Sequence, residues 1–241
     1  MELKEILDSK FSLLDKFREL APGTFRHSQN VASLCESIAL DLNLDVDLMK
    51  AAGTYHDIGK MLCPDHYSEN QNEENLHDKL DPHISYHLIT RHVGDTVLTL
   101  LQFPEFEEKI RLMEIVSQHH GSTILRFFYK KSKNKVEDSY RYKSMPPQSI
   151  EAAVLMICDS VEATARALDS TGELEETKDR RAVVNTTVDR LMQDYQLDDI
   201  KVGDLRKIKS VLYKELENMY HKREPYGDEK ESGEDDTIKI E

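Results

Sequence analysis

The chain has few of the residues that interrupt regular structure. Among its 241 residues there are only 9 glycines and 7 prolines, and tryptophan is absent. Helix-forming residues make up much of the remainder, so the composition predicts a mainly α-helical protein. No stretch approaches the roughly 18 consecutive apolar residues of a membrane span, so no transmembrane helix is expected. The predicted fold class is therefore all-α, a compact multi-helix bundle.

Cysteine is also scarce, and the 32 basic residues are fewer than the 46 acidic ones. Cys35, Cys63 and Cys158 are odd in number and scattered, which indicates reduced thiols of a cytoplasmic protein and not a disulfide framework. The N-terminus lacks the basic and apolar regions of a signal peptide. A formal net charge of -14 argues against general binding of polymeric nucleic acid or an anionic membrane surface. An anionic ligand would need a local cationic site, which metal ions would supply.

Apolar residues recur at helical spacing through most of the chain. They predict helices over 1–20, 24–42, 46–56, 82–92, 95–102, 105–118, 148–169, 178–194 and 203–221. Thr24 or Ser28 is expected to cap the second of these helices, and Asp45 or Asp47 the third. Polar composition predicts a loop over 60–82 and a mobile basic segment over 130–147. The expected organisation is an N-terminal helix (1–20), one domain (21–222) and a disordered acidic tail (223–241).

Histidine and aspartate recur beside these apolar stretches. In chain order the candidate metal ligands are His27, His56, Asp57, His92, His119, His120 and Asp159. A single histidine on a helix is more often packed or solvated than bound to metal. The joint pattern is harder to explain in that way, because an unpaired carboxylate such as Asp159 is costly in an otherwise apolar helix.

The ligand types indicate the kind of metal site. Imidazole and carboxylate without clustered cysteine favour iron, manganese or zinc in an open site, and exclude a structural thiolate zinc site. Seven donors predict two divalent metals that share one carboxylate, and Asp57 is the expected bridge because His56 precedes it. Such a pair activates a water for displacement at phosphorus. Lys60, one turn later, is then expected to neutralise a phosphate oxygen; without the metal pattern it would be a surface lysine.

Six short motifs point to a particular family. They are Ala-Pro-Gly-Thr-Phe-Arg-His-Ser (21–28), Tyr-His-Asp-Ile-Gly-Lys-Met (55–61), Glu-Asn-Gln (69–71), Gln-His-His-Gly (118–121), Phe-Phe-Tyr (127–129) and Asp-Ser-Val-Glu-Ala (159–163). With the ligand order, they resemble the HD phosphohydrolase superfamily in its two-metal form over roughly 20–222. Within it they resemble the cytosolic catalytic domain of seven-transmembrane HD proteins. The resemblance implies an HD-domain bundle that hydrolyses cyclic di-AMP to linear pApA with iron or manganese.

The resemblance also implies how the ligands divide. One metal would take His27, His56, Asp57 and Asp159, and the other Asp57, His92, His119 and His120. The sequence departs from the family in having no membrane helices, so it is expected to be a catalytic fragment or a free-standing relative. It also has Asn75-Leu76-His77-Asp78 where the family has Asn-Pro-His-Asp, a difference outside the expected ligand set.

A small cyclic dinucleotide would need partners beyond the metals. Lys60 is expected at the phosphate beside the metals, and Arg126, with Lys130 and Arg141, at the second phosphate. The expected base contacts are stacking on Tyr129, Tyr140 or Tyr142 and polar contacts from Asn70, Gln71 and Asn75. Glu162 is expected to hold a ligand histidine or Lys60. The plainer alternatives are a solvated basic loop, packed tyrosines and an ion pair without catalytic meaning.

Three other functions remain as alternatives. A cyclic di-GMP phosphodiesterase of the HD-GYP type is disfavoured, because Gly121-Ser122-Thr123-Ile124 follows the histidine pair in place of that family's signature. A single-metal nucleotidase or dNTP hydrolase is opposed by the extra histidines. A non-catalytic nucleotide sensor would have no use for seven ligands. The sequence does not indicate the oligomeric state.

Overall fold

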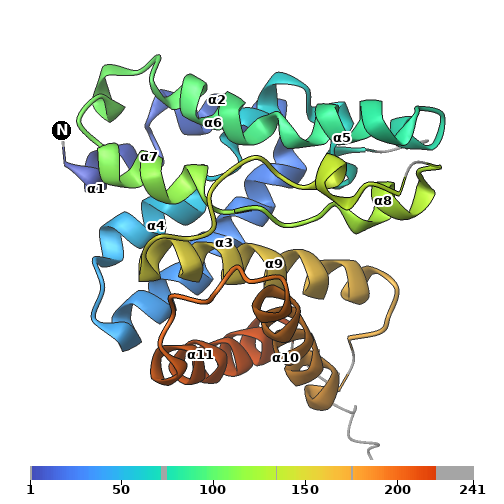
Figure 1. Ribbon diagram of the computed structural model, residues 1–241. Helices are drawn as coiled ribbons and strands as arrows, with labels where there is room; N and C mark the ends of the chain where they lie inside the picture. The colour runs from blue at the N-terminus through green and yellow to red at the C-terminus, as the bar shows by residue number, and fades with distance from the viewer. Residues whose placement is uncertain (1, 72–74, 134, 175, 221–241) are drawn as a thin grey trace, which may run out of the picture.

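The computed structural model describes residues 2–71, 75–133, 135–174 and 176–220, and regular structure there is almost entirely helical (Figure 1). Within those residues no strand is present, and the β-structure is limited to an isolated antiparallel bridge between Ile124 and Arg141. In the same part of the chain, no helix has the length and hydropathy needed to cross a bilayer. The all-α prediction is confirmed. The predicted acidic tail (223–241) lies outside the described residues.

The N-terminal segment contains two helices where one was expected over 1–20. They are α1 (Leu3–Ile6) and α2 (Ser12–Leu20). The side chain of Asp8 accepts a hydrogen bond from the backbone N–H of Lys10 at 2.9 Å, and this local bond favours a turn over a continued helix. Both helices pack on the bundle, α1 against α4 and α2 against α3.

Two helices carry the first ligands, α3 (Pro22–Leu42) and α4 (Val46–Tyr55). Proline in the first turn starts α3. Thr24 and Ser28, the two caps that the sequence suggested, therefore both lie inside the helix. Asp45 caps α4 by accepting the N–H of Leu48 at 3.0 Å, as predicted. A Cβ on Gly53 would lie 2.5 Å from the Cα of Ala32, so the backbones of α3 and α4 approach closely at this point.

The middle of the chain alternates short helical turns with short helices. The elements are η1 (Ile58–Leu62), η2 (Pro64–His66), η3 (Ser68–Asn70), η4 (Leu76–Asp78), α5 (Pro82–Thr90), α6 (His92–Leu100), η5 (Pro104–Phe106), α7 (Ile110–Ser117), α8 (Arg126–Lys131) and η6 (Glu137–Tyr140). The segment expected to be an irregular loop (60–82) therefore contains four 3₁₀ turns where it is described. Helix α6 begins three residues before its predicted start, at His92, which places a candidate ligand at its first residue.

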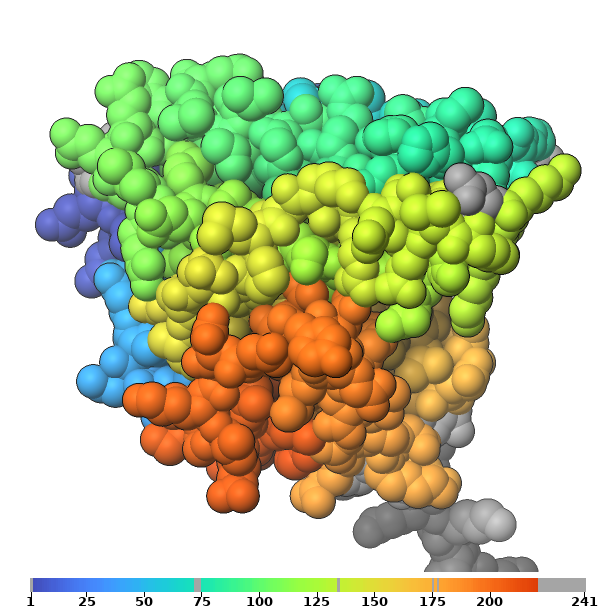
Figure 2. All heavy atoms as spheres, viewed as in Figure 1, coloured from blue at the N-terminus to red at the C-terminus, as the bar shows by residue number. Residues whose placement is uncertain are grey.

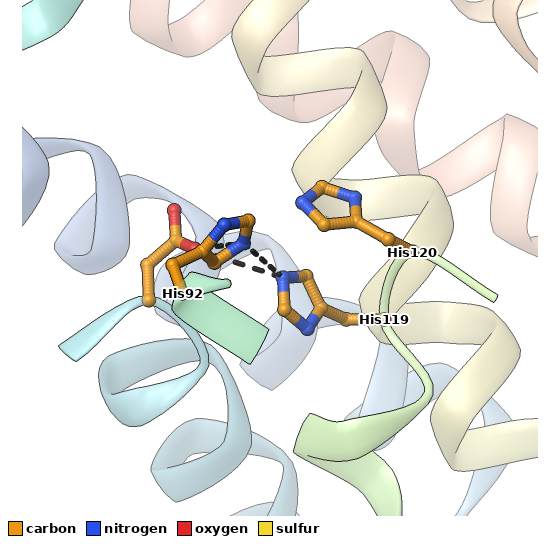
Figure 3. A group of neighbouring side chains, drawn as sticks. His92, His119 and His120 are labelled. Carbon is orange, nitrogen blue, oxygen red and sulfur yellow. Dashed lines mark hydrogen bonds and ion pairs between the residues drawn. The ribbon is translucent and has the colours of Figure 1, made fainter. Parts of the chain in front are cut away.

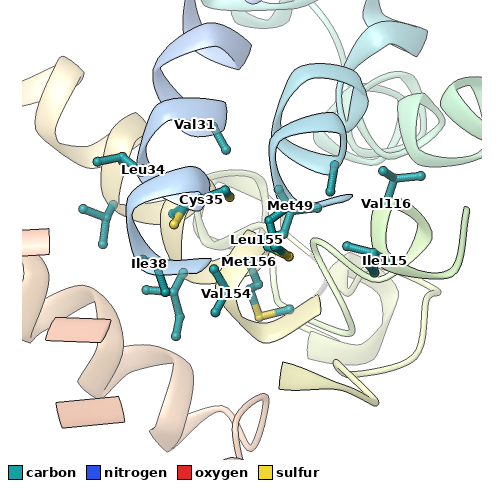
Figure 4. Packing of buried hydrophobic residues seen from close by; sticks show 14 of the residues in the cluster. Val31, Leu34, Cys35, Ile38, Met49, Ile115, Val116, Val154, Leu155 and Met156 are labelled. Atoms are coloured by element: carbon teal, nitrogen blue, oxygen red, sulfur yellow. The ribbon is translucent and has the colours of Figure 1, made fainter. Parts of the chain in front are cut away.

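Helix α9 (Ile150–Ser170) runs through the middle of the bundle, with α10 (Thr177–Gln193) and α11 (Val202–Tyr220) below it in Figure 1. Its residues Val154, Leu155 and Met156 are buried close to Val31 and Cys35 of α3 (Figure 4). Burying each large apolar side chain stabilises the fold by about 1.5–3 kcal/mol. The same helix places Asp159 against this core, next to α3.

The segment predicted to be mobile (130–147) is anchored around two buried tyrosines, whereas most of its described residues before 139 are exposed. Tyr140 and Tyr142 are buried, and backbone bonds join Leu125 to Tyr140 and Tyr142 to Thr123, each at 2.9 Å. In Figure 2 this yellow-green to yellow segment lies across the face between the α5 region and the orange C-terminal helices. The basic composition of the segment did not indicate these buried tyrosines, and mobility of the exposed part stays a prediction.

Candidate metal centre

The seven candidate ligands come from distant parts of the chain but meet in one place. They lie in α3 (His27), at the end of α4 (His56, Asp57), at the start of α6 (His92), after α7 (His119, His120) and in the middle of α9 (Asp159). Six of the seven are buried, and His120 is half-buried. Five of them stand at or just beyond helix ends, and only His27 and Asp159 lie within a helix.

The ligand atoms form two groups that share Asp57. One group joins His27, His56, Asp57 and Asp159, and the other joins Asp57, His92, His119 and His120; within each, all ligand atoms lie within 4.8 Å of one another. Oδ2 of Asp57 is 3.7 Å from Nε2 of His27 and 3.3 Å from Nε2 of His56. Oδ1 is 3.3 Å from Nε2 of His92 and 3.6 Å from Nε2 of His119. One carboxylate thus directs an oxygen into each group.

Three of the imidazoles are oriented by backbone carbonyls one turn earlier. Nδ1 of His56 donates to the carbonyl oxygen of Gly53 at 2.8 Å. In the same way, Nδ1 of His92 donates to Ile89 and Nδ1 of His119 donates to Val116, each at 2.6 Å. The bond fixes the tautomer, so the lone pair of Nε2 faces the centre. Figure 3 shows Nε2 of His92 and His119 pointing toward one another, at 3.4 Å, with His120 beside them.

His27 is held by a side chain instead. Its Nδ1 contacts Oε2 of Glu162, which is fully buried on α9, and Oε1 of Glu162 accepts from Asn30 at 2.9 Å. Its Nε2 lies 3.1 Å from Oδ1 of Asp159. A carboxylate that orients a ligand histidine raises the basicity of that histidine. Of the two expectations for Glu162, the structure shows the contact with a histidine, and Lys60 has other partners.

The donor set fits divalent metal. Nε2 of His56 and Oδ1 of Asp57 are buried without a hydrogen-bond partner, and an unpaired buried polar atom is costly. A cation in each group would remove that cost, one beside Nε2 of His56 and the other beside Oδ1 of Asp57. Clustered imidazoles with carboxylates, and no cysteine among them, match the ligand preferences of iron, manganese or zinc.

The charges of the site favour the forms that bind metal. Burial opposes ionisation of Asp57, but the neighbouring Lys60 and His56 hold its pKa well below the usual value. Burial lowers the pKa of His92 to about 3 and that of His120 well below its usual value. At neutral pH the carboxylate is therefore anionic and these two imidazoles are neutral, as ligation requires. His56 differs: despite burial, Asp57 and Asp159 raise its pKa to about 10, so a metal must displace a proton there.

Lys60 sits between two carboxylates at the edge of the centre. Its Nζ is 2.6 Å from Oδ2 of Asp57 and 3.0 Å from Oε1 of Glu69. Burial disfavours the charged ammonium, but the two carboxylates raise its pKa well above the usual value. The cation is thus held within reach of a ligand at the metal centre. Glu69 belongs to a quoted motif, yet its pairing with Lys60 was not predicted.

A cavity of about 710 Å³ opens over the centre. His27, His92, His120 and Asp159 line it, and so do three of the expected substrate residues, Lys60, Arg126 and Tyr142. The ring of Tyr142 stacks on His120, with centroids 4.3 Å apart. The cavity also takes in Arg190 and Leu191 of α10, which the sequence did not suggest, because nothing in a solvated helical pattern distinguishes a cavity-lining arginine.

The other expected substrate residues do not line this cavity. Oδ1 of Asn70 accepts the N–H groups of Gly23 and Thr24, at 2.9 and 3.1 Å, so Asn70 caps the start of α3 from outside that helix. Gln71 donates to Asp65 O at 2.7 Å. Tyr129 packs beside Tyr140 in a small separate apolar cluster. The structure does not bring these residues to the cavity, and their contact with substrate stays a prediction.

The profile of the HD domain family matches residues 24–164, more than half of the chain, and the chain belongs to this family. Its relatives include the cyclic-di-AMP phosphodiesterase PgpH of Bacillus subtilis, which is 35% identical over 94% of this chain and 32% of the relative. The chain thus spans about a third of that protein's length.

Solved structures agree with the sequence comparison. The HD domain of PgpH from Listeria monocytogenes is 34% identical, with a TM-score of 0.79 over 87% of this chain and 99% of that domain. The same domain in complex with cyclic-di-AMP is 33% identical, also with a TM-score of 0.79, over 89% of this chain and 100% of the other. The expected HD-domain bundle is confirmed.

Proposed function

We propose that this chain is a dinuclear-metal phosphodiesterase that hydrolyses cyclic di-AMP to linear pApA. The observation that carries the proposal is the division of the two oxygens of Asp57 between two groups of four potential ligands. The names of the Bacillus and Listeria relatives support the choice of substrate. The cavity of about 710 Å³ lies within the range of small-ligand sites, roughly 300–1,000 Å³.

Two divalent metals, manganese or iron, are the proposed cofactors. His27, His56, Asp57 and Asp159 would hold one, and Asp57, His92, His119 and His120 the other. Bound there, the pair would activate a water for attack on phosphorus and offset charge on the phosphoryl oxygens.

The protein's own groups would position the substrate. Lys60, charged and buried at the edge of the centre, would donate to a non-bridging oxygen of the phosphate that reacts. Tyr142, stacked on His120, would keep that imidazole in place and offer its cavity side to a base. Glu162 would keep Nε2 of His27 directed at the centre. A cytoplasmic location stays a prediction, with which the three free cysteines agree.

A turnover assay with parallel substrates tests the proposal. Manganese-loaded protein would be offered cyclic di-AMP, cyclic di-GMP and the linear dinucleotides, and the products resolved by chromatography, with chelator-treated protein as the control. We expect conversion of cyclic di-AMP to pApA, slower conversion of cyclic di-GMP, and none after chelation. No turnover of any cyclic dinucleotide, in protein shown to hold two equivalents of metal, would overturn it.

A further inference from the structure

The cavity over the metal centre continues along α9 to α10, beyond the region that matches the HD domain family. Ala163, Ala167 and Leu168 of α9 line this extension, and Leu191 of α10 faces it. Phe127, about half exposed, also lines the cavity. Charged side chains line the same cavity beside these apolar residues. The extension therefore offers space for the part of a ligand that does not react.

Three arginines line the cavity, and they differ in their partners. Arg166 lies 3.5 Å from Oε2 of Glu162, which offsets its charge. Arg126 and Arg190 form no ion pair or side-chain hydrogen bond among the described residues. The nearby carboxylate of Asp194 is already bound by Arg141, at 2.8 Å. The N–H donors of Arg126 and Arg190 therefore remain without a side-chain partner among the described residues at this end of the cavity, in a chain whose net charge is -14.

Arg126 and Arg190 also affect each other. Partial burial and the charge of Arg126 both lower the pKa of Arg190. Two like charges that line the same cavity repel, and an anion placed between them would relieve the repulsion. The planar guanidinium groups suit a phosphate, because each presents two N–H donors to its oxygens.

We propose that Arg126 and Arg190 form a second anion site, which binds the phosphate of a dinucleotide that lies away from the metal centre. The identity of the ligand rests on the proposed function, while the site itself rests on the unpaired arginines. The site would make the cavity selective for ligands with two phosphates, since a ligand with one phosphate can fill only one of the two sites at a time. Arg190 is then a specificity-determining residue supplied by α10.

The test compares substrates with two phosphates and with one. The manganese-loaded 241-residue chain would be assayed on cyclic di-AMP and on bis(para-nitrophenyl) phosphate, as wild type, Arg190→Gln and Arg190→Lys. Because hydrogen bonds between charged groups are lost, kcat/KM for cyclic di-AMP should fall about 10- to 100-fold in Arg190→Gln, mainly through KM. Turnover of the single-phosphate substrate should stay within about twofold. Arg190→Lys should recover part of the loss, because the charge remains.

The matched control is Arg206→Gln, which removes the same charge from an exposed position on α11 outside the cavity. It should leave both substrates unchanged. An equal loss on both substrates in Arg190→Gln would show a structural role, and no loss on cyclic di-AMP would show that Arg190 does not contact it. Either result overturns the second anion site.

A binding measurement separates this inference from the proposed function. If wild-type protein hydrolyses no cyclic dinucleotide, the proposed function fails, and calorimetric binding of pApA and of AMP still tests the arginines. Weaker binding of pApA by Arg190→Gln, with AMP unchanged, supports the second anion site. Equal binding of pApA by both proteins, or no binding to wild type, overturns it.

Discussion

Gly59 lies where the segment after Asp57 crosses the first turn of α6. A Cβ at this position would stand 2.4 Å from the backbone nitrogen of Thr96 and 2.6 Å from the carbonyl oxygen of His92. Cβ contacts below 3.0 Å essentially do not occur, and ordinary contact begins at 3.4 Å. A Gly59→Ala substitution must therefore move α6 away by about 0.6 Å at least, and by about 1.0 Å for full relief.

The displacement would act on both stability and the site. It stretches the 3.0 Å hydrogen bond from Gly59 N–H to Thr96 Oγ1, and it draws His92 away from Oδ1 of Asp57, now 3.3 Å away. Overpacking of this kind costs about 1–3 kcal/mol, and each kcal/mol lowers Tm by about 2–4 °C in a chain of this size. We expect Tm to fall by about 2–12 °C. A displacement of about 1 Å at the site should lower turnover about 100-fold.

Gly94→Ala is the matched control, because Gly94 lies on the same helix and an added Cβ there meets nothing within 4 Å. Replacing this helical glycine should stabilise the protein by roughly 0.5–1 kcal/mol and leave activity unchanged. The assay combines calorimetric Tm, manganese content and turnover of cyclic di-AMP. Gly59→Ala should retain one manganese of two, since only the group with His92 is disturbed. Wild-type Tm and turnover in Gly59→Ala would refute the reasoning.

Three further predictions concern the buried charges. Asp57→Ala removes the carboxylate common to both ligand groups, so it should abolish turnover. Circular dichroism should show the same helical content as in wild type. Undiminished activity would contradict the shared-ligand arrangement. Glu162→Gln weakens the hold on His27 and should lower manganese affinity about 10- to 100-fold in a titration, and unchanged affinity would show that Glu162 is not needed. Although burial opposes it, Lys60 lowers the pKa of Glu69 from 4.5 to about 2. Since the folded pKa is the lower one, this stabilisation, up to about 3 kcal/mol, is present above pH 4.5 and lost as the pH falls toward 2. The difference in urea stability between wild type and Glu69→Gln should therefore shrink between about pH 6 and about pH 3, and a constant difference would contradict the ion pair.

Local sequence patterns predict the fold class, most of the helices and the candidate ligands of this protein. Scarce glycine and proline with helical periodicity predict the all-α bundle, and the positions of most helices follow, because both signals depend on neighbouring residues. The capping role of Asp45 is equally local. The identity of the candidate ligands was also visible in the sequence, because a carboxylate within an apolar helix is costly to bury unless a metal or a hydrogen-bonding partner offsets its charge.

Only the tertiary structure decided which atoms meet. One oxygen of Asp57 faces His56 and the other faces His92. This arrangement depends on the crossing angles of α4, α6 and η1, which no local sequence pattern determines. From the sequence Asn70 is an ordinary polar loop residue, but in the structure it caps α3, whose capped residues lie 46 and 47 positions earlier in the chain. From the sequence Arg190 is expected to be a solvated arginine, but the packing of α10 on α9 places it in the lining of the cavity. Periodicity tells which face of a helix is buried, whereas the partner of that face is set by contacts between residues far apart in the chain.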